Sequence, residues 1–230
     1  SKMTKPIEVK IDVDENGDIV YDPTTNTVYQ SIHENMKNTL IYLTFIDPYK
    51  TQTLLQAKIN EQLESAKQLN KIFPTVLNSI SWSAGCISGA MTETVETSFL
   101  VGFIKVLLGL CEIIKGKGNK AICASNIMYV VGQYTRFLNA HWKFLKTVVK
   151  KLFEFMHESF EGVQDFACET FMKISMKCSH SFIKIQESEN EAYLAELVRT
   201  VYDNTKDLKQ HQQLMFYEAI GNMIKEEYTL

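Results

Sequence analysis

Cys111 is the residue of this sequence best placed for covalent chemistry, because basic residues surround it. Lys105 precedes it, and Lys115, Lys117 and Lys120 follow in a charged segment. Nearby cations lower the pKa of a thiol and raise the fraction present as thiolate, the form that attacks electrophiles. An accessible Cys111 would therefore react with electrophiles without any catalytic role. An inert, packed thiol is the alternative, and the residues by themselves leave both open.

No other group of reactive residues has the spacing of a metal or catalytic site. Cys178-Ser179-His180 has no second Cys/His pair at zinc-site spacing, so we expect a buried thiol at a helix end. Gly116-Lys117 lacks both the following Ser or Thr and the upstream glycine of a phosphate-binding loop. The five histidines are scattered, without a carboxylate-paired nucleophile. We therefore expect no enzyme activity, no metal and no cofactor.

The composition indicates a helical intracellular protein. A net charge of −3 and an isoelectric point near 6.0 argue against a nucleic-acid binder. No proline follows Pro74, so nothing beyond it has to interrupt a helix. Five cysteines, an odd number, and the lack of any Asn-x-Ser/Thr acceptor favour a reducing compartment. The N-terminus lacks the apolar core of a signal peptide. The apolar run 99–114 is too short for a membrane span, so we expect no membrane association.

Two segments of different character follow from the local patterns. In residues 1–30, an acidic segment, Glu8–Val13 alternates polar and apolar residues, and Asn16-Gly17 separates it from Ile19–Tyr21. This pattern predicts a β-hairpin lying on another surface, with a frayed acidic leader as the alternative. Residues 31–230 read as about five helix pairs. Helices are expected at about 31–46, 50–65, 70–90, 94–115, 119–138, 141–158, 161–181, 189–206 and 209–227.

Small residues recur in these helices at intervals of 43 to 47 residues. They stand in Ala84-Gly85, Val131-Gly132, Ile174-Ser175 and Ile220-Gly221. A glycine inside a helix costs about 1 kcal/mol, so its recurrence suggests that a neighbouring helix approaches closely at each position. The interval is that of two-helix HEAT or armadillo units, which stack into a solenoid. Chance spacing of the glycines is the alternative.

Two of the expected helices carry more apolar surface than a core requires. In 141–158 the apolar arc spans about 180°, whereas about 100° suffices for a helix on a core. The edge formed by Phe144, Val148 and Phe155 is therefore not needed for packing on a core. In 99–114, a similar flank consists of Leu100, Val101, Ile104, Leu108 and Cys111. As equivalent helices of successive repeats, the two would line a furrow suited to a peptide helix, unless neighbouring repeats bury both flanks.

Basic residues around the furrow would favour acidic segments beside the peptide's anchors. These residues are Lys105, Lys117, Lys120, Lys143 and Lys151.

Several runs of this sequence resemble the exportin-1 family of karyopherin receptors, which bind leucine-rich nuclear export signals. They are Leu107–Glu112, Asn119–Ile122, Ala124–Tyr129, Val131–Tyr134, Ala140–Val149 and Lys151–Glu158. The likeness covers nearly the whole chain and corresponds to the middle of a much larger receptor. It implies an all-α HEAT-repeat solenoid whose partners are export-signal cargo, Ran-GTP and nuclear pore proteins. It also implies shuttling between nucleus and cytoplasm, with no direct contact to nucleic acid.

The resemblance further implies where the export signal binds, namely in a groove between the helices at 94–115 and 141–158. The apolar lining would be Ile104, Leu108, Cys111, Ala124, Met128, Phe137, Phe144, Val148 and Phe155. The rim would be Lys105, Lys120, Thr147, Lys151, Glu154 and Glu158. Cys111 matches the groove cysteine that electrophilic export inhibitors modify. The hairpin at 7–22 resembles the family's internal loop, which contacts Ran in one state and props the groove closed in the other.

The sequence also departs from the family pattern at a few positions. Val106 replaces an acidic residue, Ile113-Ile114 replaces polar residues, and Lys150 stands where Asn is common. The stretch Glu64–Phe73 lacks the expected Trp-rich linker. None of these departures removes a groove residue. Two other functions remain open, a purely structural solenoid scaffold and, less favoured, an enzyme that uses the Cys111 thiol.

Overall fold

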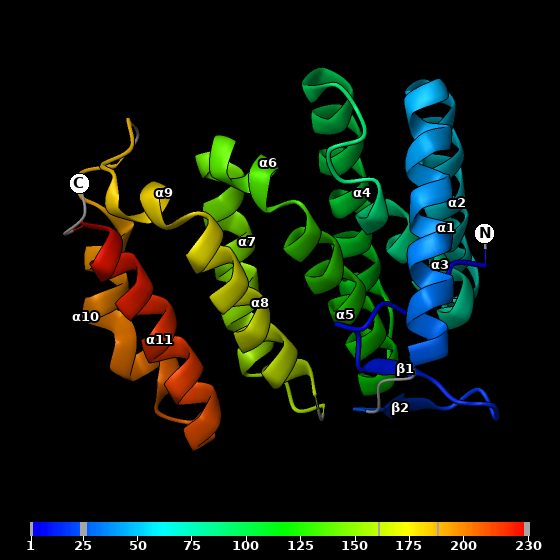
Figure 1. The fold of residues 1–230 in the computed structure, drawn as a ribbon. Coiled ribbons are helices and arrows are strands. Elements are labelled where there is room, and N and C mark those ends of the chain that lie inside the picture. Colours follow the sequence, from blue (N-terminus) through cyan, green and yellow to red (C-terminus); the bar gives the residue numbers. More distant parts are fainter. Residues whose placement is uncertain (1, 24–26, 161, 188, 228–230) are drawn as a thin grey trace. The chain divides into compact units, whose positions relative to one another are not determined.

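The structure, a computed structural model, describes residues 2–23, 27–160, 162–187 and 189–227. These residues form eleven helices and one two-stranded sheet, which confirms the predicted all-α fold with an N-terminal hairpin (Figure 1). Residues 1, 24–26, 161, 188 and 228–230 lie outside the described residues, as do the parts of the predicted segments 1–30 and 31–230 that fall on them.

The chain divides into two compact units, residues 1–134 with 160–162 and residues 135–159 with 163–230. The first unit holds the hairpin and α1 (Thr27–Ile46), α2 (Pro48–Leu69), α3 (Pro74–Cys86), α4 (Glu93–Ile113) and α5 (Lys117–Gln133). The second holds α6 (Thr135–Ala140), α7 (Trp142–Met156), α8 (Val163–Lys177), α9 (Ser179–Ile183), α10 (Tyr193–Thr205) and α11 (Gln210–Glu227). Composition gives no sign of this division.

The hairpin consists of β1 (Ile11–Val13) and β2 (Ile19–Tyr21), paired antiparallel with Asp12 opposite Val20. Its turn forms because the Asp14 carboxylate accepts the backbone N–H groups of Asn16 and Asp18, both at 2.9 Å. Gly17 there adopts a φ of +88°, a conformation that glycine reaches without a steric penalty. β1 packs against α3 and α5, and β2 packs against α5 (Figure 1). The predicted supporting surface is thus confirmed, although the first strand is shorter than expected.

Helix boundaries differ from prediction around Pro74. The expected helix 70–90 is wrong at both ends, since α2 continues to Leu69 and stops where Asn70 adopts a left-handed φ of 48°. Pro74 then occupies the first turn of α3, where its missing N–H costs nothing. At the other end, α3 stops at Cys86, before Gly89 with its positive φ of 79°.

Two predicted helices are each broken into a long and a short one. The expected 119–138 becomes α5 and α6, and the expected 161–181 becomes α8 and α9. Neither break contains a proline or glycine, so no local signal marks it. Tertiary contacts occupy both places: the buried Tyr134 hydroxyl donates to the Ala84 carbonyl at 2.8 Å, and the Cys178 thiol donates to the Thr135 carbonyl at 3.4 Å.

In the first unit, α4 lies along α2, α5 lies along α3, and α4 packs on α5. Gly85 of α3 faces α5 so closely that a Cβ there would overlap Cε1 of Tyr129 and lie 3.0 Å from its Cζ. The predicted close approach is confirmed at this position. It is wrong at Gly221, which is exposed and where a Cβ would meet no atom within 4 Å.

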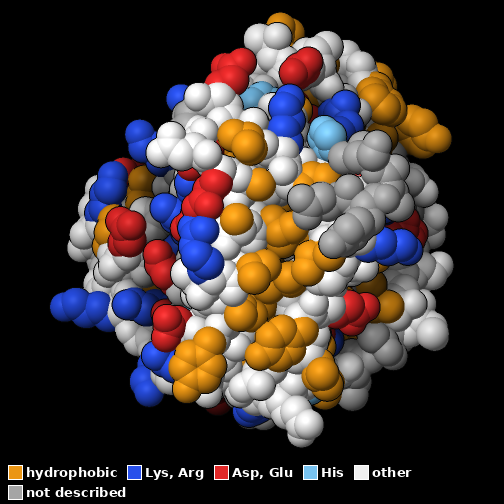
Figure 2. Space-filling view, turned by 90° about the vertical axis from the view of Figure 1, so that its left-hand side faces the viewer, with side chains coloured by type: hydrophobic (Ala, Val, Ile, Leu, Met, Phe, Trp, Pro, Cys, Tyr) orange, Lys and Arg blue, Asp and Glu red, His pale blue; other side chains and the backbone are white. Residues whose placement is uncertain are grey.

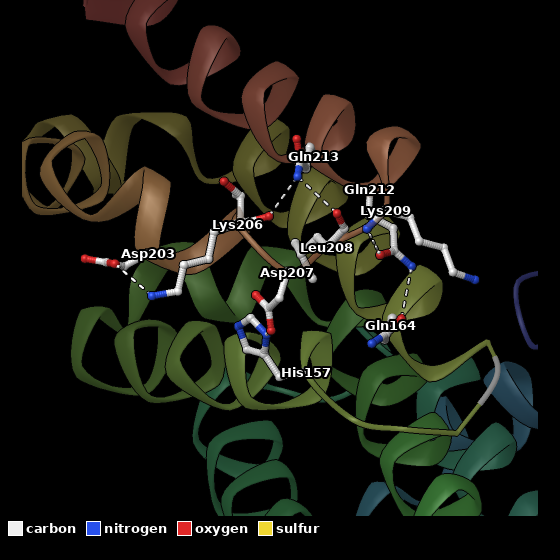
Figure 3. A network of polar contacts seen from close by, with 10 residues as sticks. His157, Gln164, Asp203, Lys206, Asp207, Leu208, Lys209, Gln212 and Gln213 are labelled. Atoms are coloured by element: carbon white, nitrogen blue, oxygen red, sulfur yellow. Dashed lines mark hydrogen bonds and ion pairs between the residues drawn. The ribbon is translucent and has the colours of Figure 1, made fainter.

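In the second unit, α8 packs against both α7 and α11, and aromatic rings join the three helices. The ring centroids of Phe153, Phe171 and Phe216 lie 5.1–5.5 Å apart. Polar contacts fix the turn between α10 and α11 (Figure 3). The His157 ring pairs with the Asp207 carboxylate at 2.9 Å, and the Gln213 amide donates to two carbonyls of the turn at 3.0 Å.

Candidate functional site

The first half of the predicted site lies on one face of α4. Gly102 and Gly109 mark the face toward α2, since a Cβ at either would lie within 4 Å of Gln56 or Leu63. Helical residues advance by about 100°, which places Ile104, Leu108 and Cys111 on the opposite face. The flank that the sequence marks as surplus is therefore the one that α2 leaves uncovered.

These three residues differ in accessibility. Ile104 is buried, whereas Leu108 and Cys111 are partly exposed. On α5, Ala124 and Met128 stand one turn apart, and both are buried. The rim residues Lys105 and Lys120 are exposed. Among the predicted lining residues of this half, the accessible ones are consequently Leu108 and Cys111.

The second half of the predicted site lies on α6 and α7. Phe137 packs edge-on against Phe144, with ring centroids 5.6 Å apart, and stacks on His141 at 4.0 Å. Phe144 is partly exposed, whereas Phe137 is buried, as are Val148 and Phe155. The structure thus joins Phe137 to Phe144 through their rings and leaves Phe144 as the accessible member.

The rim residues of this half lie along α7 and just beyond its end. The Lys151 ammonium lies 5.4 Å from the centre of the Phe155 ring and pairs with the Glu154 carboxylate. Thr147, Glu154 and Glu158 are exposed. α4 and α7 belong to different compact units, so a single groove that joins the two halves stays a prediction.

Accessibility separates Cys111 from the other four cysteines. Cys111 is partly exposed, whereas Cys86, Cys123, Cys168 and Cys178 are buried. Burial raises the pKa of Cys86 to about 11, raises the pKa values of Cys168 and Cys178 to about 12, and also raises the pKa of Cys123. Since the thiolate is the reactive form, the four buried thiols are poor nucleophiles. The buried thiol expected at Cys178 is confirmed.

One polar cluster of the first unit has no counterpart in the sequence analysis. The Cys86 sulfur lies 3.6 Å from both the His33 Nε2 and the Tyr129 hydroxyl, beside a cavity of about 170 Å³. The other ring nitrogen of His33 contacts the Thr4 carbonyl at 2.8 Å. No sequence signal links residues so far apart. Burial raises the pKa of Cys86, so the reactive thiolate is disfavoured in this cluster. No group of three or more His, Cys, Asp or Glu side chains in the described ranges could hold a metal.

A chain of hydrogen bonds connects the hairpin to the helix that carries Ala124 and Met128. The Asn126 side-chain amide donates to the Asn78 side-chain oxygen Oδ1 at 2.8 Å, and the Asn78 side-chain amide donates to the Asp12 carboxylate at 3.0 Å. Burial raises the pKa of Asp12, although the Val13 N–H, the charge of Lys5 and the Asn78 amide oppose the rise. This relay crosses from β1 through α3 to α5.

One expectation about the most apolar helix needs correction. The predicted helix at 94–115 is confirmed as α4, Glu93–Ile113, but its 21 residues exceed the apolar run 99–114, which we expected to be too short for a membrane span. Among the described residues it alone has the length and hydropathy of a membrane span, a pattern that core helices share. Its packing against α2 and α5 accounts for that character.

Apolar residues are also exposed outside the predicted site. Figure 2 looks from the side on which α10 and α11 lie and shows hydrophobic side chains gathered in a band. On these helices the exposed apolar residues are Val198, Tyr202, Leu214, Tyr217 and Ile224. None of them belongs to the predicted groove, so they can serve as control positions.

Comparison with protein families gives two matches. Residues 1–51 match the family described as CRM1 / Exportin repeat 2, and residues 74–118 match CRM1 / Exportin repeat 3. Both matches fall in the first unit. Together with the helical structure they indicate HEAT-like repeats, in agreement with the predicted fold class.

Comparison with known proteins extends the likeness to nearly the whole chain. Over 227 residues the chain is 50% identical to Protein EXPORTIN 1A of Arabidopsis thaliana, covering 99% of this chain and 21% of that protein. It is 48% identical to Exportin-1 of Drosophila melanogaster, with the same coverage. It is 48% identical over 225 residues to Exportin-1 of Schizosaccharomyces pombe, covering 98% of this chain and 20% of that protein.

Proposed function

We propose that this chain, a homologue of exportin-1 proteins over about one fifth of their length, forms the export-signal-binding part of a nuclear export receptor. The observation that carries the proposal is identity near 50% across 99% of the chain. The surplus apolar residues of α4 and α7 supply a physical means of binding. The ligand is a leucine-rich segment with hydrophobic side chains at helical spacing.

Binding proceeds by transfer of the peptide's apolar side chains from water onto the two surfaces. Each fully buried Leu, Ile or Phe contributes about 1.5–3 kcal/mol. Leu108 and Phe144 are partly exposed and make the first contacts. Ile104 and Val148 are buried, so a peptide reaches them only after side chains rearrange. The apparent affinity is then lowered by the fraction of molecules in the open state.

Further partners follow from the same homology. In the whole receptor, cargo binding is cooperative with Ran-GTP, passage through pores uses nuclear pore proteins, and the receptor shuttles between nucleus and cytoplasm. The hairpin is linked to α5, which carries the predicted groove residues Ala124 and Met128, by the hydrogen bonds of the Asp12–Asn78–Asn126 relay. Deleting residues 7–22 should therefore change peptide affinity.

Single substitutions at the partly exposed residues provide the test. A fluorescein-labelled peptide with four leucine-type anchors is titrated against the wild type, Leu108→Gln and Phe144→Gln. Each variant should bind at least about tenfold more weakly, since an apolar contact and its area are lost. Leu54→Gln and Leu214→Gln change exposed leucines elsewhere in each unit and should bind like the wild type. Thermal melts confirm that every variant is folded.

The scaffold alternative makes a different prediction for the same titration. If the apolar flanks only hold repeats together, the peptide binds neither the wild type nor any variant, whereas the melting temperatures still shift. Equal affinities for the wild type and both site variants would likewise reject the proposal.

A further inference from the structure

An open cleft of about 670 Å³ lies beside the N-terminal end of α7 in the second unit. One wall comes from α7 and the other from the segment between α9 and α10. The residues that matter here are Trp142, Lys143 and Phe144 on α7, and Lys184, Ile185 and Glu187 on the segment. Apolar and charged side chains therefore line the cleft together.

The two lysines of this cleft lack the carboxylate partners that other lysines of the second unit have. Lys143 and Lys184 are exposed, and neither forms an ion pair with a described residue. By contrast, Lys146 of the same helix pairs with Glu189 at 2.8 Å. Glu187 is the one carboxylate in the lining, so the cleft has a net positive charge. Such a charge suits a ligand with acidic groups.

Gln186 in the cleft wall and Glu189 beyond it are each bonded to neighbouring residues. The Glu189 carboxylate accepts hydrogen bonds from the Lys146 ammonium at 2.8 Å and the Trp142 indole N–H at 3.3 Å. The bonds from Lys146, followed by the one from Trp142, hold the pKa of Glu189 below its usual value, so it stays charged. At the near end, the Gln186 amide donates to the Ser181 carbonyl at 3.0 Å. Residues bonded in this way lose less freedom when a ligand binds, which lowers the entropy cost of binding.

The cleft also adjoins the second half of the candidate site. Phe144 lines the cleft and packs on Phe137, and both belong to the predicted groove. Ile185, 61% exposed, provides an apolar surface on the facing wall. Phe144 therefore lies in the same cleft as Lys143 and Lys184, two cations that form no ion pair with a described carboxylate.

We propose that this cleft binds acidic residues that flank the hydrophobic anchors of an export signal at one end, with Lys143 and Lys184 pairing their carboxylates. The inference rests on the proposed function, and it adds a subsite whose second wall, with Lys184 and Ile185, is not among the predicted groove residues. Glu187 opposes acidic ligands and limits the gain. Exposed ion pairs are weak and screened by salt, so each lysine contributes about a two- to fivefold gain in affinity at low salt.

The test uses three peptides with identical anchors, one with neutral flanks, one with two Asp before the anchors and one with two Asp after them. Their affinities are measured by fluorescence anisotropy for the 230-residue wild type, Lys143→Gln, Lys184→Gln and the double variant. Lys150→Gln and Lys177→Gln remove equal charge from exposed positions outside the cleft. Glu187→Gln removes the opposing carboxylate.

The proposal requires that one acidic peptide bind more tightly than the neutral one, and that the double variant abolish this gain. Neutral-peptide affinity and both control variants should stay within about twofold of wild type, and Glu187→Gln should tighten the acidic peptide. If the acidic gain survives in the double variant, or falls equally in the controls, the cleft is not the subsite, and the proposed function stands. If no peptide binds at all, both the subsite and the proposed function are overturned.

Discussion

A methyl group added at Gly85 should destabilise the first unit, whereas the same change at Gly221 should stabilise the second. Both glycines lie within helices, so each Gly→Ala change improves helix propensity by up to about 1 kcal/mol. The two sites differ in the space around the new Cβ. This makes them a matched pair for the close-packing interpretation of the recurring small residues.

The expected magnitudes follow from the neighbours of each Cβ. At Gly85 the methyl would overlap the edge of the Tyr129 ring and lie 3.1 Å from Gln133 Cγ. Tyr129 is buried and contacts the Cys86 thiol, so its ring has little freedom to retreat. Overpacking of this kind costs about 1–3 kcal/mol, which leaves a net loss of up to about 2 kcal/mol after the gain in helix propensity. At Gly221 a Cβ meets no atom within 4 Å, so only the gain in helix propensity remains.

Urea unfolding with a single tryptophan in each unit measures the two effects separately. Trp82 reports on the first unit in a Trp142→Phe background, and Trp142 reports on the second unit in a Trp82→Phe background. Gly85→Ala should lower the urea midpoint, and Gly221→Ala should raise it, with unchanged m-values. Equal stabilisation by both substitutions would refute the inference that α3 and α5 need a glycine at their contact.

Three other predictions concern the thiol, a carboxylate and the relay. Iodoacetamide at pH 8 should modify Cys111 before the four buried thiols, because burial raises the pKa of Cys86, for example, to about 11; uniform labelling in mass spectra would contradict this. Partial burial raises the pKa of Asp165, but hydrogen bonds from two neighbouring side chains outweigh it and hold the pKa below 3.8. Asp165→Asn should therefore lower the urea midpoint at pH 7, and its deficit should shrink as the pH falls below 3.8, since a carboxylate with a depressed pKa stabilises the fold only while it is ionised; an unchanged deficit would argue against the bonds from His211 and Gln212. Asn78→Ala should cost about 1–3 kcal/mol in urea unfolding, because it removes the hydrogen bonds that Asn78 makes to the Asp12 carboxylate and to the buried Asn126 amide; a loss below about 0.5 kcal/mol would show that water replaces them.

Locally encoded features of the fold were predictable from the sequence. The hairpin depends on Asp14, Asn16 and Gly17, three neighbours whose turn chemistry needs nothing distant. The long helices follow from periodicity and from the lack of proline after Pro74. By contrast, the breaks before α6 and α9 coincide with bonds from Tyr134 and Cys178 to distant carbonyls, which no local pattern encodes.

The candidate site was predictable in part for the same reason. A helical wheel identifies the surplus flanks of α4 and α7, and the structure places Leu108 and Phe144 partly exposed there. The wheel does not predict that Ile104 and Val148 are buried, because burial depends on the neighbours of the helix and not on its own pattern. The cleft next to Phe144 could not be predicted from the sequence either, since its second wall comes from a segment some forty residues later.

The three phenylalanine rings in mutual contact in the second unit have a consequence for its slow motions. Phe171 lies within ring contact of both Phe153 and Phe216, so separating any one of these helices exposes the rings of the other two. Native-state hydrogen exchange should therefore give α7, α8 and α11 one common opening free energy. Phe182 of the five-residue α9 belongs to a second ring cluster, with Trp142 of α7 and Tyr193 of α10, so α9 should open together with its two partners in that cluster.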